Sequence, residues 1–248
     1  MITDPAFYWV AVPAIILTGL AKGGFLGALG GLAVPMMSLV ISPIQAAGIM
    51  LPILNVMDLT GVYAYRRDYH WENLRIMVPA AFVGVLVGYL TAALVTEAHV
   101  RLMVGVIGLV FSLQYWLSLT PTGTAPGPDR VKGSIWGAIA GFTSFVSHSG
   151  APPFQVYMLP QRLTPPVFAA TAVGFFTSVN AVKLIPYYAL GQFNAANLMT
   201  TAVLLPLAPI AMLAGVWLTR WVPQEPFYRI AYAGLLVISV KHIWDGLL

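Results

Sequence analysis

Two short stretches of the chain place an amide and an ionisable residue three positions apart within apolar sequence. One contains Asn55 and Asp58, and the other contains Asn180 and Lys183. Residues with this spacing lie on one face of a helix, and an ionisable group within an apolar run usually faces a cavity or a partner. Asp58 and Lys183 could form a structural salt bridge. Alternatively, Lys183 attracts an anionic substrate while Asp58 tunes it or carries a proton; the two roles are compatible.

The two asparagines add neutral donors and acceptors beside these charges. Asn55 and Asn180 hold equivalent places in the two stretches, so they could clamp one small polar ligand from both sides. Their other possible role is hydrogen bonding between helices, which contributes about 0.6–2 kcal/mol in membranes. Both roles remain open at the level of sequence.

A third candidate region is the polar cluster at residues 143–153, which ends in Pro152 and Pro153. Hydroxyl groups and backbone N–H groups at a helix break can bind an anion. His148 could donate to such an anion or titrate near neutral pH, or it could be a core histidine with its own partner. The candidate ligand-binding residues of this cluster are Ser147, His148, Ser149 and Gly150.

The first half carries a corresponding feature at Lys22, which is followed by Gly23 and Gly24. Lys22 is a candidate for gating or ion coupling, together with Asp58 and His148. Its alternative role is that of an interfacial anchor, since its expected place is the cytoplasmic end of an apolar segment.

The composition identifies the class of protein that must position these residues. Of the 248 residues, 59% are hydrophobic and 8% are charged, and the mean hydropathy is +0.83. Soluble domains carry about 25% charged residues, so an integral membrane protein is predicted. The apolar runs are continuous rather than alternating, which favours helices over a barrel. The fold class predicted is therefore all-α, with helices that span a membrane several times.

Other features of the sequence narrow the function. There are no cysteines, which excludes disulfides and thiol chemistry. The dispersed basic residues do not indicate a nucleic acid partner, and the N-terminus lacks the basic region of a signal peptide. We expect no metal site and no cofactor, because the four histidines are scattered and the phosphate-loop pattern of ATPases is absent.

The chain divides into two halves of five apolar segments each. The first transmembrane repeat is predicted at 1–120, a Pro/Gly/Thr-rich linker at 121–132, and the second repeat at 133–248. The ten segments are 6–21, 25–41, 46–65, 76–95, 100–119, 133–147, 151–160, 167–190, 198–219 and 227–247.

An ordered series of matches relates the two halves. The matched pairs are Asn55 and Asn180, Leu59 and Leu184, Tyr63 and Tyr188, Asn73 and Asn197, Pro79 and Pro206, Gly88 and Gly215, Arg101 and Arg229, and Trp116 and Trp244. The offset drifts by only a few residues, as small loop insertions would produce. A structural repeat is therefore predicted.

The positions of Lys and Arg predict an external N-terminus. With this orientation the cytoplasmic loops hold Lys22, Arg66, Arg67, Arg75, Arg130, Lys132, Arg162, Arg220 and Arg229. The external side holds only Arg101 and Lys241. Because five segments is an odd number, the second half runs opposite to the first. This is the inverted-topology repeat that many secondary transporters use.

The first two segments of each half are expected to be short, broken or re-entrant. The first half is glycine-rich between Gly19 and Pro35, and the second half has Gly150 before two prolines. The segment at 151–160 is too short to span about 30 Å as a helix. The glycines alone could equally serve helix packing.

The glycine and proline pattern resembles a known family. Gly19–Phe25 with Gly30, Gly31 and Pro35, the turn at 43–48 leading to Pro52 and Asn55-x-x-Asp58, and Gly150–Phe154 with the run from Ala169 to Asn180 are similar to the sulfite exporter TauE/SafE family. The resemblance implies a bacterial inner-membrane exporter of sulfite or of an organosulfonate such as sulfoacetate, coupled to an ion such as a proton or sodium.

The residue chemistry and the resemblance together favour a secondary transporter that works by alternating access. Its partners would be a small anionic substrate, the lipid bilayer and a coupling ion; the sequence indicates no oligomeric state. The alternatives are an anion channel, or a transporter of another small carboxylate or oxyanion. A membrane enzyme using Ser147 or His148 is disfavoured, because no third group orients this pair.

Overall fold

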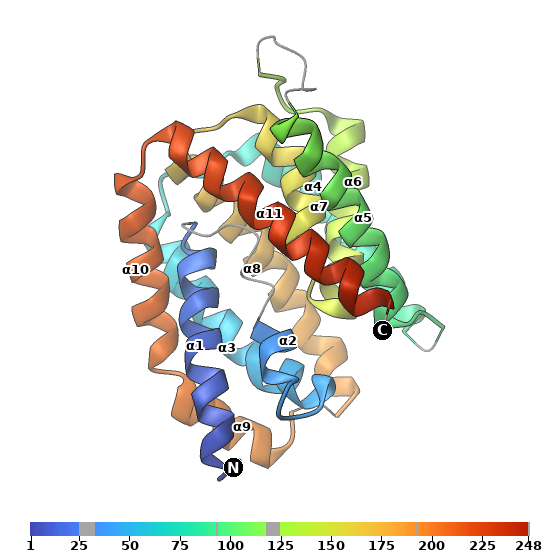
Figure 1. Cartoon of the computed structure of the whole chain (residues 1–248), viewed down its shortest axis with the longest axis vertical. Helices are drawn as coiled ribbons and strands as arrows, with labels where there is room; N and C mark the ends of the chain where they lie inside the picture. Colours follow the sequence, from blue (N-terminus) through green and yellow to red (C-terminus); the bar gives the residue numbers. More distant parts are fainter. Residues whose placement is uncertain (25–32, 93, 118–124, 192, 248) are drawn as a thin grey trace.

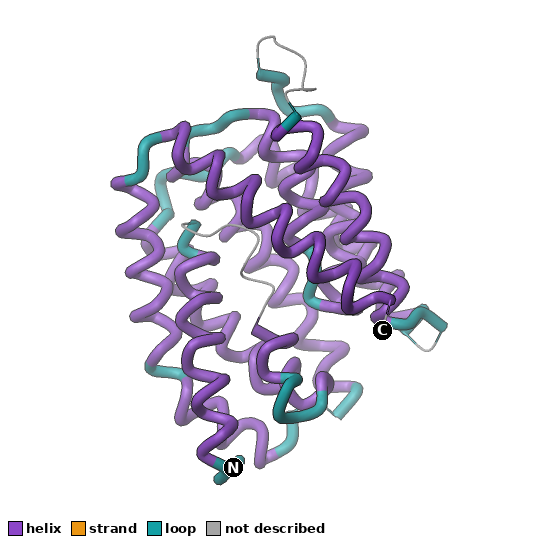
Figure 2. The backbone as a smooth tube through the Cα atoms, in the orientation of Figure 1, coloured by secondary structure: helices purple, strands orange, loops and turns teal. Residues whose placement is uncertain are grey.

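The computed structural model describes residues 1–24, 33–92, 94–117, 125–191 and 193–247, and in these ranges it is helical without strands (Figures 1 and 2). The first half contains α1 (Pro5–Lys22), α2 (Ala33–Met37), α3 (Pro43–Ala64), α4 (Trp71–Leu90) and α5 (Glu97–Trp116). The second half contains α6 (Arg130–Ser147), α7 (Ala151–Met158), the short 3-10 helix η2 (Leu159–Gln161), α8 (Pro165–Ala189), α9 (Ala195–Leu204), α10 (Leu207–Trp221) and α11 (Gln224–Leu247).

Six helices of the described chain are long and apolar enough to cross a membrane: α1, α3, α4, α5, α8 and α11. A seventh crossing is formed if α9 and α10, bent by 46° at a short break, count as one span. The protein is therefore a multi-pass membrane protein. The ten apolar segments of the sequence are not ten spans, because α2, α6 and α7 do not meet these criteria.

Local sequence signals fix where these helices begin. The Asp129 side chain accepts a hydrogen bond from the Lys132 N–H at the start of α6, and Ser42 caps α3 in the same way ahead of Pro43. Proline suits the first turn of a helix because its missing N–H has no partner there in any case. Pro165 opens α8 by this rule.

The α6–α7 pair enters and leaves the molecule on the same side. His148 ends α6 in a left-handed conformation with φ of 54°. The chain then turns back through α7, so that the Tyr157 hydroxyl accepts a hydrogen bond of 3.0 Å from the Asp129 N–H at the start of α6. This agrees with the expected break before Pro152 and Pro153 and shows that α6 and α7 form a hairpin.

The chain before α3 also starts and finishes at one end of the molecule. The Ile2 N–H donates to Thr200 Oγ1 on α9 at 3.0 Å. The Gln45 amide donates to Asn197 Oδ1 on the same helix at 3.2 Å, and α1 packs against α2. The glycines expected to break this segment at 27, 30 and 31 lie outside the described residues.

The four main helix pairings are α1 with α10, α4 with α6, α5 with α11 and α3 with α8. Glycines allow the first two to approach closely. A Cβ placed on Gly23 would lie 2.6 Å from the Gly215 Cα, and one placed on Gly137 would lie 2.7 Å from the Met77 carbonyl oxygen. These glycines therefore serve backbone contact between helices, as is common in membrane proteins.

Candidate functional site

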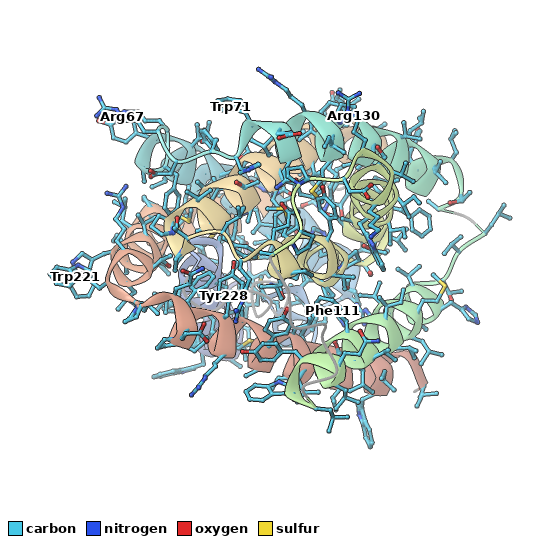
Figure 3. All side chains as sticks on the ribbon, turned by 90° about the horizontal axis from the view of Figure 1, so that it is seen from above. Arg67, Trp71, Phe111, Arg130, Trp221 and Tyr228 are labelled. Atoms are coloured by element: carbon cyan, nitrogen blue, oxygen red, sulfur yellow. The ribbon has the colours of Figure 1, made fainter. Side chains whose placement is uncertain are left out.

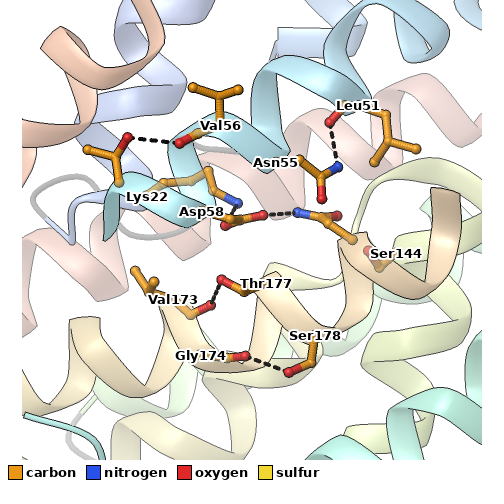
Figure 4. Close-up of polar contacts among 12 residues, drawn as sticks. Lys22, Leu51, Asn55, Val56, Asp58, Ser144, Val173, Gly174, Thr177 and Ser178 are labelled. Carbon is orange, nitrogen blue, oxygen red and sulfur yellow. Dashed lines mark hydrogen bonds and ion pairs between the residues drawn. The ribbon is translucent and has the colours of Figure 1, made fainter. Parts of the chain in front are cut away.

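Asp58 is buried in α3 with two partners from other helices (Figure 4). Its side chain is 1% exposed, and Lys22 Nζ at the end of α1 lies 2.6 Å from Oδ1. Asn180 on α8 donates to Oδ2 at 2.7 Å. The salt bridge considered between Asp58 and Lys183 is therefore wrong: the carboxylate pairs with Lys22, which is not merely an interfacial anchor.

Lys183 is fully buried in α8, and its hydrogen-bond partners are neutral. Its ammonium donates to the Ser144 carbonyl oxygen at 2.7 Å, and it lies 3.4 Å from both Ser144 Oγ and His148 Nδ1. Ser144 O is among the last four carbonyls of α6, where a cation is favoured by the helix dipole. No carboxylate of the described residues lies within ion-pair distance of Lys183.

His148 links Lys183 to a tyrosine one turn further along α8. Its Nε2 lies 2.8 Å from the Tyr187 hydroxyl. An ammonium can only donate, so the contact with Lys183 makes Nδ1 the acceptor. The neutral ring then carries its hydrogen on Nε2 and donates it to Tyr187. If the ring were a charged imidazolium, its Nδ1–H and the Lys183 ammonium would be two cationic donors facing each other.

Beside these groups lies a cavity of about 100 Å³ between α1, α2, α3, α6, α7 and α8, which we call the first cavity. Its polar lining comes from Lys22, Ser144, His148, Gln155 and Asn180. A buried water needs only about 10–15 Å³ of such space, so a small polyatomic anion fits. Lys183 lies directly behind Ser144 and His148 in this wall.

Gln155 is a residue of this cavity that the sequence reasoning missed. It is 3% exposed, and its Oε1 has no hydrogen-bond partner in the part of the chain that the structure describes. A buried polar atom without a partner is costly unless a ligand or water satisfies it. A single amide in the apolar sequence of α7 was the available signal. Ser144 and Tyr187 were likewise not singled out.

Other candidate residues lie elsewhere or are engaged locally. The Asn55 amide donates to the Leu51 carbonyl of its own helix at 2.8 Å (Figure 4). The Ser147 hydroxyl donates to the Thr143 carbonyl at 3.2 Å, and the Ser149 hydroxyl to the Ser147 carbonyl at 3.1 Å.

The helix break itself offers few backbone donors. The Ser149 N–H is bonded to the Thr143 carbonyl, and Pro152 and Pro153 have no N–H. Gly150 lines the first cavity, where a Cβ would come within 2.8 Å of the Ser144 Cβ. The described geometry therefore offers side chains, more than free backbone N–H groups, as donors to an anion.

Tyr65, in the turn after α3, fixes the end of α1 that carries Lys22. Its hydroxyl donates to the Gly23 carbonyl at 2.6 Å, and Thr219 donates to the same oxygen at 2.9 Å. Burial raises the pKa of the Tyr65 phenol, so it remains a protonated donor at physiological pH.

The described residues contain no group of His, Asp or Glu that could hold a metal ion.

Comparison with known proteins places this chain in a class and then in a family. The helices and the cavity define the class, a multi-pass membrane protein with a buried, partly polar cavity. Residues 11–242 match the model of the family described as Sulfite exporter TauE/SafE. The chain belongs to this family, whose members are membrane transporters rather than enzymes, and the predicted resemblance is confirmed. No curated protein and no solved structure matches the chain.

Proposed function

We propose that the protein is a secondary transporter that exports a small organosulfur anion, sulfite or an organosulfonate such as sulfoacetate, across the bacterial inner membrane. The observation that carries this proposal is the Lys183 ammonium, which is fully buried and bonded to neutral groups beside a cavity. An ionisable residue at membrane depth generally marks a substrate or ion pathway.

The lining of the first cavity suits an anion of this class. A sulfite or sulfonate head presents three acceptor oxygens, and the cavity wall offers the Ser144 hydroxyl and the Gln155 amide, with Lys183 directly behind. Asn180 uses one amide hydrogen on Asp58 and retains a second. Phe154 and Phe176 form an apolar wall against which an organic tail could pack.

The helix pairings support two halves related by inverted topology. If α1–α5 and α6–α11 are exchanged, the contact of α1 with α10 becomes that of α6 with α4. The matched residues Asn73 and Asn197 also each bond to a glutamine of the other half, Gln161 at 2.7 Å and Gln45 at 3.2 Å. Movement of one half against the other around Lys183 would give alternating access.

The proposed orientation places the N-terminus outside. Figure 3 looks at the opposite end of the molecule, where Arg67 and Arg130 lie. Arg66, Arg162 and Arg220 also stand close to the turns that follow α3, η2 and α10. This end would face the cytoplasm by the bias of basic residues toward cytoplasmic loops.

Export of an anion is favoured by the membrane potential alone. Each negative charge that leaves a cell with 100 mV negative inside gains about 2.3 kcal/mol. Coupling to a proton or sodium would add to this drive. Asp58 with Lys22, and His148, are the groups proposed for gating or coupling, because they are ionisable, Lys22 and His148 line the first cavity, and Asp58 pairs with Lys22.

Proteoliposomes loaded with sulfite, sulfoacetate or isethionate test the proposal. We expect saturable efflux and counterflow for at least one of them, and loss of both in Lys183→Ala. Lys241→Ala is the matched control, because Lys241 forms an exposed ion pair with Asp245 and does not line the cavity. Conductance without saturation or counterflow would identify an anion channel. Absence of any movement by folded protein would refute the proposal.

A further inference from the structure

A second cavity, of about 160 Å³, lies on the other side of His148 from the first. It is lined by the beginning of α3, the turn between α4 and α5, the end of α6 and the end of α8. Its polar side chains are Arg101, Ser147, His148 and Tyr187. The two cavities share only His148 and Val34 among their described lining residues.

The cavities follow one another along the same helix. On α8 the first cavity reaches from Phe168 to Asn180, and the second begins at Tyr187. At 1.5 Å per residue the 25 residues of α8 extend about 37 Å, enough to cross the hydrocarbon core. The two spaces thus form successive parts of one path across the membrane.

Lys183 lies at the level of the partition. It stands on α8 between Asn180, which lines the first cavity, and Tyr187, which lines the second. Its ammonium is 3.4 Å from His148 Nδ1, and the opposite ring nitrogen is bonded to the Tyr187 hydroxyl. Hydrogen bonds with Lys183 and Tyr187 therefore hold the ring that separates the two spaces.

We propose that the second cavity is an outer binding site for the same class of anion, and that the His148 ring held by Tyr187 is the barrier between it and the first cavity. This inference rests on the proposed transport function and assigns the second half of the route. An anion bound near Lys183 passes outward when the ring swings aside, and Arg101 then provides the next positive charge. Once His148 has moved, the Tyr187 hydroxyl donates to an anion oxygen.

Single cysteines can test this proposal because the natural chain has none. Ala47→Cys reports on the second cavity, Ala172→Cys on the first, and the exposed Leu94→Cys is the control on the same end of the molecule. Each is treated in proteoliposomes, from the side of the N-terminus, with the 2-sulfonatoethyl or the trimethylammonioethyl methanethiosulfonate. The first reagent is itself an organosulfonate.

We expect the ratio of anionic to cationic modification rates to be at least about tenfold higher at Ala47→Cys than at Leu94→Cys. Arg101→Gln should bring the two ratios together, and Arg101→Lys should restore the difference. Equal ratios at the two cysteines in otherwise unmodified protein would overturn the outer site.

The modification rate of Ala172→Cys tests the barrier separately. Ala172→Cys should resist both reagents from this side, and His148→Ala should raise its modification rate by at least about tenfold by joining the cavities. Ready modification of Ala172→Cys with His148 in place would refute the barrier. If the natural protein showed no efflux that depends on Lys183, the transport function would be refuted, but the charge preference at Ala47→Cys could still be observed. Failure of the transport function and failure of the outer site are therefore distinguishable.

Discussion

The first and second halves of the protein each place an ionisable side chain on their longest central helix, and the two side chains have different partners. Asp58 on α3 meets an opposite charge, Lys22, at the end of α1. Lys183 on α8 meets a carbonyl oxygen and an imidazole at the end of α6. Positions that the predicted repeat matches therefore hold a neutralised pair on α3 and a cation with neutral partners on α8.

This difference assigns separate roles to the two halves. A buried pair is costly to break and fixes the relative positions of α1, α3 and α8, which Asn180 also joins. A cation with neutral partners attracts an anion that supplies the missing charge. We infer that the Asp58 centre, in addition to its proposed part in gating or coupling, holds these helices together, and that the Lys183 centre binds the substrate.

The largest expected effect is on transport by the Lys183 centre. Lys183→Ala should reduce the initial rate of anion efflux by at least about 30-fold, because truncating a buried charged contact costs roughly 2–5 kcal/mol and about 1.4 kcal/mol is a factor of ten. Efflux from proteoliposomes measures it, with insertion checked by size-exclusion chromatography. Efflux close to that of the natural protein would remove Lys183 from the site and abolish the contrast between the halves.

The next effect is on stability at the Asp58 centre. Asp58→Ala should lower the free energy of unfolding by about 3–5 kcal/mol, because Lys22 is left buried without its partner. The double variant Lys22→Met/Asp58→Leu should recover at least half of this loss. Denaturant titration in detergent measures both. A double variant as unstable as Asp58→Ala would show that the pair is not the source of the loss.

Packing at the two equivalent helix crossings should give smaller losses. Gly23→Ala and Gly137→Ala each force a Cβ against the backbone of the facing helix and should cost about 1–3 kcal/mol. Gly127, with open space around it, is the control. Equal thermal stability of all three variants would argue against glycine-dependent contact at α1–α10 and α4–α6.

Removal of the Tyr65 hydroxyl should have the smallest effect of this series. Tyr65→Phe loses the 2.6 Å bond to the Gly23 carbonyl, worth about 1 kcal/mol, while Thr219 still donates to that oxygen. Burial raises the pKa of this phenol, so the loss should be the same at pH 6 and pH 8. Thermal unfolding at both values measures it; a loss confined to pH 8 would contradict a protonated donor.

Much of the architecture follows from local sequence signals. Continuous apolar runs predict membrane helices, and Pro152 and Pro153 after a polar cluster predict the turn between α6 and α7. The partner of Asp58 could not be predicted from local sequence. Lys22 is 36 positions away and meets Asp58 only through the packing of α1 on α3 and α10. Gln155 has only a weak local signal, as the single amide of α7, because its importance depends on which face of α7 lines the cavity.

Crystals or frozen grids prepared with selenite, the heavier analogue of sulfite, would test the central claim most directly. The anion should be found in the first cavity, within hydrogen-bonding distance of the Lys183 ammonium or of Ser144 and Gln155 beside it. The same preparation of Lys183→Ala should show none there. Selenite bound to Lys22 in place of Asp58, or equally well without Lys183, would contradict the account.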